Sequence, residues 1–219
     1  MASLMVYIVR HGETLLNSFD RMQGWCDSEL TEKGKQQAIQ AGKILKSLDF
    51  DTVVSSDLGR AKQTRDLILN QLNHQPAHTL ESKDFREVLF GFFEGLDSDE
   101  TWFKVGEPFG YHTQSDIIRA KGLPEARRLM HLQDTSHLAE TSEQVLNRWH
   151  DGIQSIRDNC VAPANILLVT HGTFIRSLAE DNGIKTLNDY PKNGAVSVLQ
   201  IELTAANLVS YNKMSLDKS

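Results

Sequence analysis

The sequence predicts an α/β fold, a three-layer α/β/α sandwich whose sheet is mostly parallel with one antiparallel edge strand. Short apolar runs alternate with amphipathic helical segments, the order typical of a parallel sheet covered by helices. Residues 165–170, NILLVT, form a continuous apolar run, as expected of a strand buried on both faces. Near the end of the chain, 196–203 and 207–212 are predicted to form a hairpin at the sheet edge.

The first third of the chain supplies the strands and helices of one side of this sheet. Apolar residues cluster in short β-rich runs, and between them they recur at intervals of three and four, the spacing of an amphipathic helix. Strands are therefore predicted over 5–9, 51–56 and 77–80, and helices over 31–48 and 61–72.

The regular alternation weakens over residues 83–140, which begin with a stretch rich in Phe, Trp and Gly. We predict that this section is an irregular or helical insertion over one edge of the core. Regularity returns at 141–160, where Thr141 and Gln144 fit a capping box at the start of an amphipathic helix. A short helix over 173–183 follows the apolar run that ends at Thr170.

Length and composition are those of a single globular domain spanning 1–219. The net charge of −6 argues against a nucleic-acid partner, which requires clustered Lys and Arg, but it does not exclude an anionic substrate. Cys26 and Cys160 are far apart and predict free thiols in a reducing compartment. No apolar run is long enough to span a membrane and no signal-peptide pattern precedes Met5, so we expect a cytoplasmic protein. Whether it forms a homodimer is left open.

Two of the predicted strands end in the same pattern, a histidine followed by a glycine. His11 follows the strand at 5–9, and His171 follows the strand that ends at Thr170. If the two strands are parallel neighbours, both imidazoles emerge at the sheet edge where ligands bind. Arg10 precedes the first histidine, and Arg60 lies at or just before the start of a helix, which attracts anions.

Two histidines and two arginines suit phosphoryl transfer through a phosphohistidine. Arginine presents a planar fork that matches phosphate oxygens and stays charged, and imidazole is a nucleophile near neutral pH. One histidine attacks phosphorus while the remaining groups hold the oxygens and offset developing charge. With this much positive charge from side chains, we expect no metal site and no cofactor.

The reaction also needs a carboxylic acid, because the leaving alcohol takes up a proton and the attacking water later loses one. Glu87 lies in the segment REVLFGFFEG, 86–95, where apolar neighbours can desolvate it. Glu94 is the rival candidate and Glu81 the third.

Four motifs, in this order, carry a family resemblance. They are RHGET at 10–14 with Asn17 following, GWCDSELTEKGKQQA at 24–38, SDLGRAKQT at 56–64 and THG at 170–172. Together they resemble the motifs of the histidine phosphatase superfamily, the phosphoglycerate mutase-like proteins. The resemblance covers most of the chain and is weakest over 97–140. It implies an α/β/α sandwich with an insertion above the active site.

The resemblance also implies roles for individual residues. His11 is implied to be the phosphorylated nucleophile, and Glu87 the proton donor, since 86–95 is similar to the family's segment after the third strand. Residues expected to contact the phosphoryl group or substrate are Arg10, Asn17, Gln23, Gly24, Arg60, His171 and Gly172. For Asn17 the alternative is that it only caps a turn.

The acceptor of the phosphoryl group decides between activities. Family mutases carry basic and tyrosine-bearing residues directly after the acid, whereas here Val88, Leu89 and Phe90 follow, and the arginine pair at 127–128 lies further along, on an expected helix surface. We therefore predict a metal-independent phosphatase of the histidine acid phosphatase type, acting on a small phosphorylated molecule. The alternative is a phosphoglycerate mutase, and a non-catalytic phospholigand-binding module is less favoured.

Six aromatic residues in and before the insertion have two interpretations of equal weight. Either they pack the insertion, or they line the pocket for the part of the substrate beyond the phosphate. They are Phe90, Phe92, Phe93, Trp102, Phe103 and Phe109.

Overall fold

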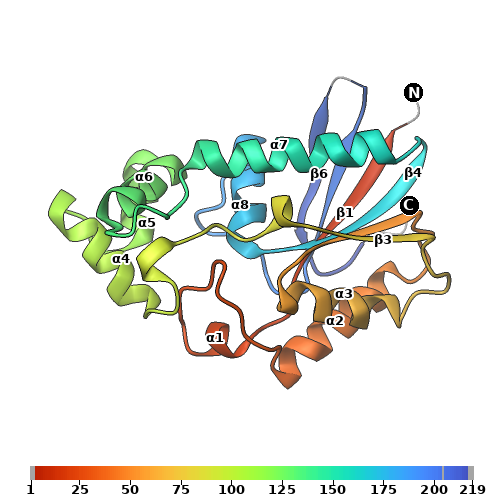
Figure 1. Cartoon of the computed structure of the whole chain (residues 1–219), viewed down its shortest axis with the longest axis horizontal. Helices are drawn as coiled ribbons and strands as arrows, with labels where there is room; N and C mark the ends of the chain where they lie inside the picture. Colours follow the sequence, from red (N-terminus) through yellow and green to blue (C-terminus); the bar gives the residue numbers. More distant parts are fainter. Residues whose placement is uncertain (1–2, 204, 217–219) are drawn as a thin grey trace.

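The computed structural model describes residues 3–203 and 205–216 and contains a six-stranded sheet with the order β3-β2-β4-β1-β5-β6 (Figure 1). The strands are β1 (Leu4–Arg10), β2 (Thr52–Ser56), β3 (His78–Ser82), β4 (Ala164–Thr170), β5 (Val196–Ile201) and β6 (Ala206–Lys213). The first four are parallel, while β5 is antiparallel to both β1 and β6. The predicted mostly parallel sheet with an antiparallel edge is confirmed.

Helices cover both faces of the sheet (Figure 1). The helices of one face are α7 (Ser142–Asn159) and α8 (Gly172–Asp181), and those of the other are α2 (Glu32–Leu45) and α3 (Gly59–Leu69). Alternating residues of β1 divide between the two hydrophobic cores: Ile8 packs in the core with α7 and α8, and Val9 in the core with α2 and α3. The three-layer sandwich is confirmed.

Helix α7 shows how the sequence pattern produces a layer of the fold. Thr141 accepts a hydrogen bond from the amide of Gln144, whose side chain accepts one from the amide of Thr141, so the predicted capping box is present. Val145, Trp149 and Ile156 recur at helical spacing, and all three are buried against the sheet.

The insertion is largely helical, which is one of the two forms that the sequence predicted. It contains α4 (Ser98–Gly106), α5 (Gln114–Lys121) and α6 (Leu123–Gln133), with the 3₁₀ turns η1 (Lys83–Phe85), η2 (Gly91–Phe93) and η3 (Glu107–Phe109). The three helices gather at one end of the molecule, at the left in Figure 1. Outside the insertion, the short helix α1 (Leu15–Ser18) follows β1, and the sequence did not predict it.

Asp134, near the end of the insertion, fastens it to the loop near its beginning. Its carboxylate accepts hydrogen bonds from the amides of Phe92, Leu138 and Ala139, at 2.7 to 2.9 Å. These bonds, with those of Ser136, hold the pKa of Asp134 well below its usual range. Gly91 has φ +61°, and a Cβ there would lie 2.0 Å from the Asp134 carboxylate, so glycine is required at this contact.

The described residues include no helix that is a candidate for crossing a membrane. No helix within 3–203 and 205–216 combines the length and the apolar character needed to cross a bilayer.

Candidate active site

The parallel pairing of β1 with β4 brings two imidazoles together. Arg10 is the register partner of Thr170, so His11 and His171 leave their strands at equivalent positions. Their ring centroids lie 5.1 Å apart with an interplanar angle of 61°, and both side chains are buried. The prediction that both histidines emerge at the same sheet edge is confirmed.

The glycine after each histidine permits a close approach. A Cβ at Gly12 would lie 2.2 Å from the carbonyl oxygen of Gly34, at the start of α2. A Cβ at Gly172 would lie 2.6 Å from the Tyr190 hydroxyl and 2.8 Å from Arg10 Nε. Any larger residue would push these groups away from the two histidines.

His11 is held as a neutral imidazole with one nitrogen directed at the site. Its Nδ1 lies 2.7 Å from the carbonyl oxygen of Gly12, and because a carbonyl only accepts, Nδ1 carries the proton. Burial, then the charges of Arg60 and Arg10, hold the pKa of His11 well below its usual value of 6.5. Nε2 therefore carries the lone pair that a nucleophile requires, and in this structure it accepts a hydrogen bond from Arg60 Nε.

Arg60 sits in the first turn of α3 and reaches the nucleophile candidate. Its Nε lies 3.3 Å from His11 Nε2. The rest of the buried guanidinium donates to the carbonyls of Gly24 and Cys26 at 2.6 and 2.9 Å, and forms an ion pair with Asp27 at 2.9 Å. The loop around Gly24 thus fixes the cation beside the imidazole.

Arg10 and the loop before β5 complete this side of the site. Arg10 Nη1 donates to the carbonyl of Pro191 at 2.5 Å, and its guanidinium lies over the Tyr190 ring, 5.1 Å from the centroid. Asn193 donates from Nδ2 to the carbonyl of His11 at 2.9 Å. Tyr190 and Asn193 were missed by sequence reasoning, because loop residues so far along the chain carry no periodic signal.

Several buried nitrogens at this edge have no partner among the described residues. They are both ring nitrogens of His171 and Nε of Arg10. Burial, then the charges of Arg60 and Arg10, hold the pKa of His171 well below its usual value. Because buried polar atoms are ordinarily hydrogen-bonded, a convergent set of unsatisfied nitrogens marks a place for an anionic ligand.

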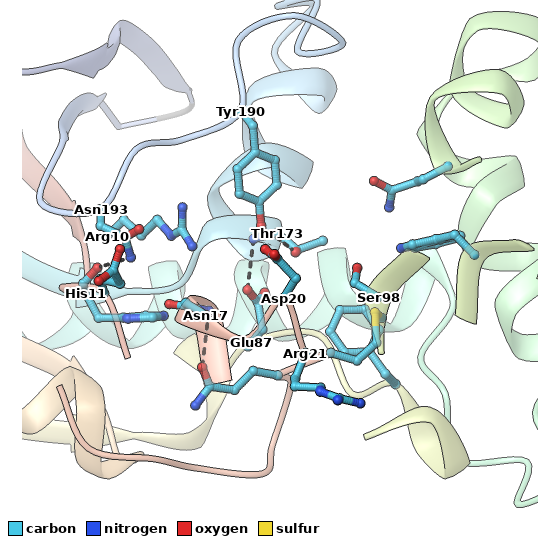
Figure 2. Close-up of a pocket in the computed structure, with 16 residues that line it drawn as sticks. Arg10, His11, Asn17, Asp20, Arg21, Glu87, Ser98, Thr173, Tyr190 and Asn193 are labelled. Atoms are coloured by element: carbon cyan, nitrogen blue, oxygen red, sulfur yellow. Dashed lines mark hydrogen bonds between the residues drawn. The ribbon is translucent and has the colours of Figure 1, made fainter. Parts of the chain in front are cut away.

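The carboxyl group of Glu87 lies against the start of α8, the helix that follows His171. Its Oε1 accepts hydrogen bonds from the amides of Val88 and Phe174 at 2.9 and 2.7 Å, and its Oε2 accepts one from Thr173 at 2.9 Å (Figure 2). The buried carboxyl group is thus fixed by the N-terminal amides of a helix. Oε2 makes only one of these bonds and retains capacity for a shared proton.

These groups surround a pocket of about 340 Å³. Figure 2 shows Arg10, His11 and Asn193 on one side, Glu87 in the middle, and Ser98 and Arg21 on the side away from His11. The walls of the pocket come from the loops after β1, from the Glu87 segment and the rest of the insertion, and from the loop before β5. They are formed by Arg10, His11, Glu13, Asn17, Asp20, Arg21, Met22, Gln23, Glu87, Phe90, Ser98, Trp102, Gln114, Thr173, Tyr190 and Asn193.

The comparison with protein families covers nearly the whole chain. Residues 6–214 match the model of the histidine phosphatase superfamily, branch 1. The chain belongs to this superfamily.

Solved structures of similar proteins agree with this assignment. Phosphoglycerate mutase from Bacillus anthracis str. Sterne is 32% identical, with a TM-score of 0.87, over 97% of this chain and 94% of that one. YhfR from Bacillus stearothermophilus is 26% identical, with a TM-score of 0.75, over 98% of both chains. Phosphoserine phosphatase from Entamoeba histolytica, in complex with 3-phosphoglyceric acid, is 21% identical, with a TM-score of 0.69, over 96% and 97%.

Within this superfamily member, the expected site residues occupy two layers. Arg10, His11, Asn17, Gln23 and Glu87 line the pocket directly. Three residues lie behind them. Arg60 contacts His11, and the ring of His171 lies against that of His11. Gly172 packs under Arg10. Gly24 also lies behind the pocket residues. Its N–H donates to Glu94 and its carbonyl accepts from Arg60, so in this structure Gly24 supports Arg60.

Asn17 and Gln23 are linked side chains at the edge of the pocket. Asn17 forms a capping box with Thr14, and its Nδ2 donates to Gln23 Oε1 at 3.3 Å. The same oxygen accepts from the Thr14 hydroxyl at 2.6 Å, and Gln23 Nε2 donates to Ser28. Asn17 therefore caps a turn and also faces the pocket, so the two alternatives for this residue are compatible.

The rival carboxylates are occupied elsewhere. Glu94 accepts hydrogen bonds at 3.0 Å from four amides, those of Gly24, Trp25, Cys26 and Phe90. It braces the loop that holds Arg60 and does not line the pocket. Glu81 is exposed on β3 and pairs with Arg65 at 3.0 Å.

The expectation that both residues of the arginine pair lie on a helix surface is wrong for Arg127. Arg127 is 4% exposed, whereas the Arg128 side chain is 57% exposed and pairs with Glu125. Arg127 Nη2 donates to the carbonyl of Thr173 at 3.3 Å and to the Ser177 hydroxyl. Burial lowers the pKa of Arg127 to about 10, with Glu87 as the first opposing charge.

A half-buried arginine, Arg148, supports the backbone of Glu87. Arg148 on α7 forms a two-bond ion pair with Glu140 at 2.7 and 2.8 Å and donates to the carbonyls of Asp84 and Glu87. Glu140 in turn accepts from the amide of Leu89 at 2.9 Å. Sequence reasoning missed this clamp, because its parts come from three separate segments.

The described residues contain no candidate metal site. Within 3–203 and 205–216, no three His, Cys, Asp or Glu side chains are grouped so that they could hold an ion.

Proposed function

We propose that this histidine phosphatase superfamily member hydrolyses a small phosphate monoester through a phosphohistidine on His11. The observation that supports this most directly is the placement of His11 Nε2. It carries a lone pair, lies 3.3 Å from the Arg60 cation, and belongs to a pocket that also contains Glu87. A nucleophile, cations and a carboxylic acid are the groups that metal-independent phosphoryl transfer needs.

In the first step, His11 Nε2 attacks phosphorus and the bond between phosphorus and the leaving oxygen breaks. The leaving oxygen takes the proton of the Glu87 carboxyl group, so the product is an alcohol. Arg10, Arg60 and the one N–H of the neutral His171 ring attract the phosphoryl oxygens as negative charge shifts onto them.

In the second step, water attacks phosphorus and the bond to His11 Nε2 breaks. The water gives its proton to the Glu87 carboxylate, which restores the acid for the next cycle, and phosphate leaves. The amides of Val88, Thr173 and Phe174 keep the carboxyl group in one place during both transfers.

The distribution of cations supports a phosphatase over a mutase. A phosphoglycerate carries a carboxylate besides its phosphate, and binding it needs further positive charge. Arg127 is buried behind α8 and Arg128 is paired on the outer surface, so neither lines the pocket. Phe90 occupies the wall directly after the acid.

Phosphoglycerate mutase is the second candidate function. Arg21 lines the pocket on the side away from His11 (Figure 2), where it can meet a substrate carboxylate. The 32% identity to a structure named as a phosphoglycerate mutase favours the same reading.

One assay separates these functions. The chain, in EDTA, is incubated with p-nitrophenyl phosphate, with alkyl phosphates and with 3-phosphoglycerate. A phosphatase releases inorganic phosphate, and a mutase converts 3-phosphoglycerate to 2-phosphoglycerate with little release. Tight binding of phosphate with no turnover of any ester would instead favour a binding module.

A further inference from the structure

A second cavity adjoins the pocket of the proposed active site. It has a volume of about 830 Å³ and lies between α4 and the start of α5. Three residues, Ser98, Trp102 and Gln114, line both cavities, so they form the boundary between them. A ligand whose phosphate lies at His11 and whose far end passes this boundary enters the second cavity.

The two cavities differ in chemical character along this direction. Beyond the phosphate end, the first pocket presents polar side chains, among them Asp20, Arg21 and Ser98, which suit a hydroxylated group. Gln114 at the boundary is held in place, because its Oε1 accepts a hydrogen bond from the buried Arg176 at 3.1 Å.

The wall of the second cavity is aromatic. Phe103 and His112 stack with ring centroids 5.7 Å apart and an interplanar angle of 26°, and Trp102 lies at the boundary. Phe103 is 48% exposed, so the stacked pair presents apolar ring surface to solvent. Stacked rings at the end of a polar channel are a surface on which a planar ring system packs.

We propose that the second cavity binds the planar ring system of the substrate, which is a phosphomonoester whose ring and phosphate are joined by a polar spacer, as in a nucleoside monophosphate. This inference rests on the proposed function, because the phosphate at His11 anchors the ligand. The combined volume of the two cavities also exceeds what a three-carbon phosphoester fills. Of the two interpretations of the aromatic residues, substrate binding applies to Phe103, whereas Phe93 and Trp102 pack in the core, Trp102 also lying at the boundary of the two cavities.

The test compares substrates that carry the ring with one that lacks it. Values of kcat/KM are measured for the four common nucleoside 5′-monophosphates and for ribose 5-phosphate, which has the spacer without the ring. We expect at least one nucleotide to exceed ribose 5-phosphate by about tenfold, the contribution of a base stacked on aromatic side chains. Phe103→Ala is expected to lower this ratio about fivefold to tenfold.

Phe92→Ala is the matched control. Phe92 is 63% exposed, belongs to the same part of the chain and lies outside both cavities, so its removal leaves the ratio unaltered. A ratio near one for all four nucleotides, or a ratio that survives Phe103→Ala, would overturn the inference.

A binding measurement separates this inference from the proposed function. Nucleotides and ribose 5-phosphate are titrated calorimetrically into His11→Ala, which cannot form the phosphohistidine. If the wild type turns over no ester, the phosphatase proposal fails. Nucleotide binding that is tighter than ribose 5-phosphate binding, and that depends on Phe103, still supports the ring site in that case. Turnover of p-nitrophenyl phosphate without any preference for the ring rejects the ring site alone.

Discussion

Arg60 Nε lies 3.3 Å from Nε2 of His11, so a buried cation faces the lone pair of the proposed nucleophile. The imidazole stays neutral beside this charge, and burial and Arg60 together lower its pKa. The same guanidinium is tied to the loop of Gly24 and Cys26. Arg60 therefore adds to burial in keeping the nucleophile neutral, and it attracts the phosphoryl group to it.

Arg60→Lys tests this dual role. Lysine keeps the charge but cannot reach His11, Gly24 and Cys26 at once. We expect kcat/KM for p-nitrophenyl phosphate to fall by about 10²-fold to 10³-fold. Loss of the buried hydrogen bonds should lower the free energy of unfolding in urea by about 2–4 kcal/mol.

Lys62→Met is the control in the same helix. Lys62 is partly exposed and pairs with Glu81 at 3.6 Å, a surface contact that contributes less than about 1 kcal/mol. If Arg60→Lys behaved like Lys62→Met in both measurements, Arg60 would have neither role.

The choice of Glu87 as proton donor predicts a dependence on the leaving group. p-Nitrophenolate leaves without a proton, whereas an alkoxide must take one. Glu87→Gln should lower kcat for an alkyl phosphate by about 10²-fold to 10⁴-fold and affect p-nitrophenyl phosphate far less in the first step, measured as the burst of p-nitrophenol.

Glu94→Gln supplies the comparison for the rival carboxylate. Its four amide bonds brace the loop behind Arg60, so we expect lower stability and a loss of activity that is similar for both esters. A leaving-group dependence in Glu94→Gln and none in Glu87→Gln would reverse the assignment.

The part of the site that could be predicted from the sequence is the part built on strand ends. A strand followed by His-Gly occurs twice, and parallel pairing of β1 with β4 made the meeting of His11 and His171 a consequence of topology. Arg60 could be located because it opens a helix after β2.

The remaining parts depend on contacts between segments distant in the sequence. Tyr190 and Asn193 lie in a loop without periodicity, and Trp102 reaches the pocket only because α4 folds over it. Arg127 was misread, because a polar side chain at a helical position predicts exposure, whereas α8 packs over it and supplies its hydrogen-bond acceptors.

Arg127→Met separates stability from activity. Methionine removes a desolvated charge, since burial already lowers the pKa of Arg127 to about 10. We expect the free energy of unfolding to stay within about 1 kcal/mol or to rise. Turnover of alkyl phosphates should fall about tenfold or more, because Thr173, whose amide donates to the Glu87 carboxyl group, loses the hydrogen bond from Arg127 to its carbonyl.

The adjacent Arg128→Met is the matched control for this variant. Arg128 is exposed and pairs only with Glu125 on its own helix, so both stability and turnover should remain near those of the wild type. Equal turnover in the two variants would show that Arg127 does not support the acid.

Buried neutral histidines predict a pH dependence of folding. The pKa values of His11 and His171 are lowered well below 6.5, so at mildly acidic pH the unfolded chain binds more protons than the folded one. Their contribution to stability is complete above about pH 6.5 and is lost as the pH falls through that value toward the lowered pKa values.

Urea unfolding of the wild type and of His171→Gln, at several pH values from about 7.5 down to about 5, measures this contribution. The variant should lose less stability over this interval, because one of the two suppressed protonations is gone. Parallel curves for the two proteins would show that His171 is not a buried neutral group.

The central claim is that His11 carries the phosphoryl group during turnover. The chain is mixed with p-nitrophenyl phosphate, quenched in alkali, which preserves phosphohistidine, and digested for mass spectrometry. The account predicts an acid-labile phosphoryl adduct on the peptide that contains His11, absent from His11→Ala together with turnover. Turnover that persists in His11→Ala, or an adduct on a different residue, would contradict it.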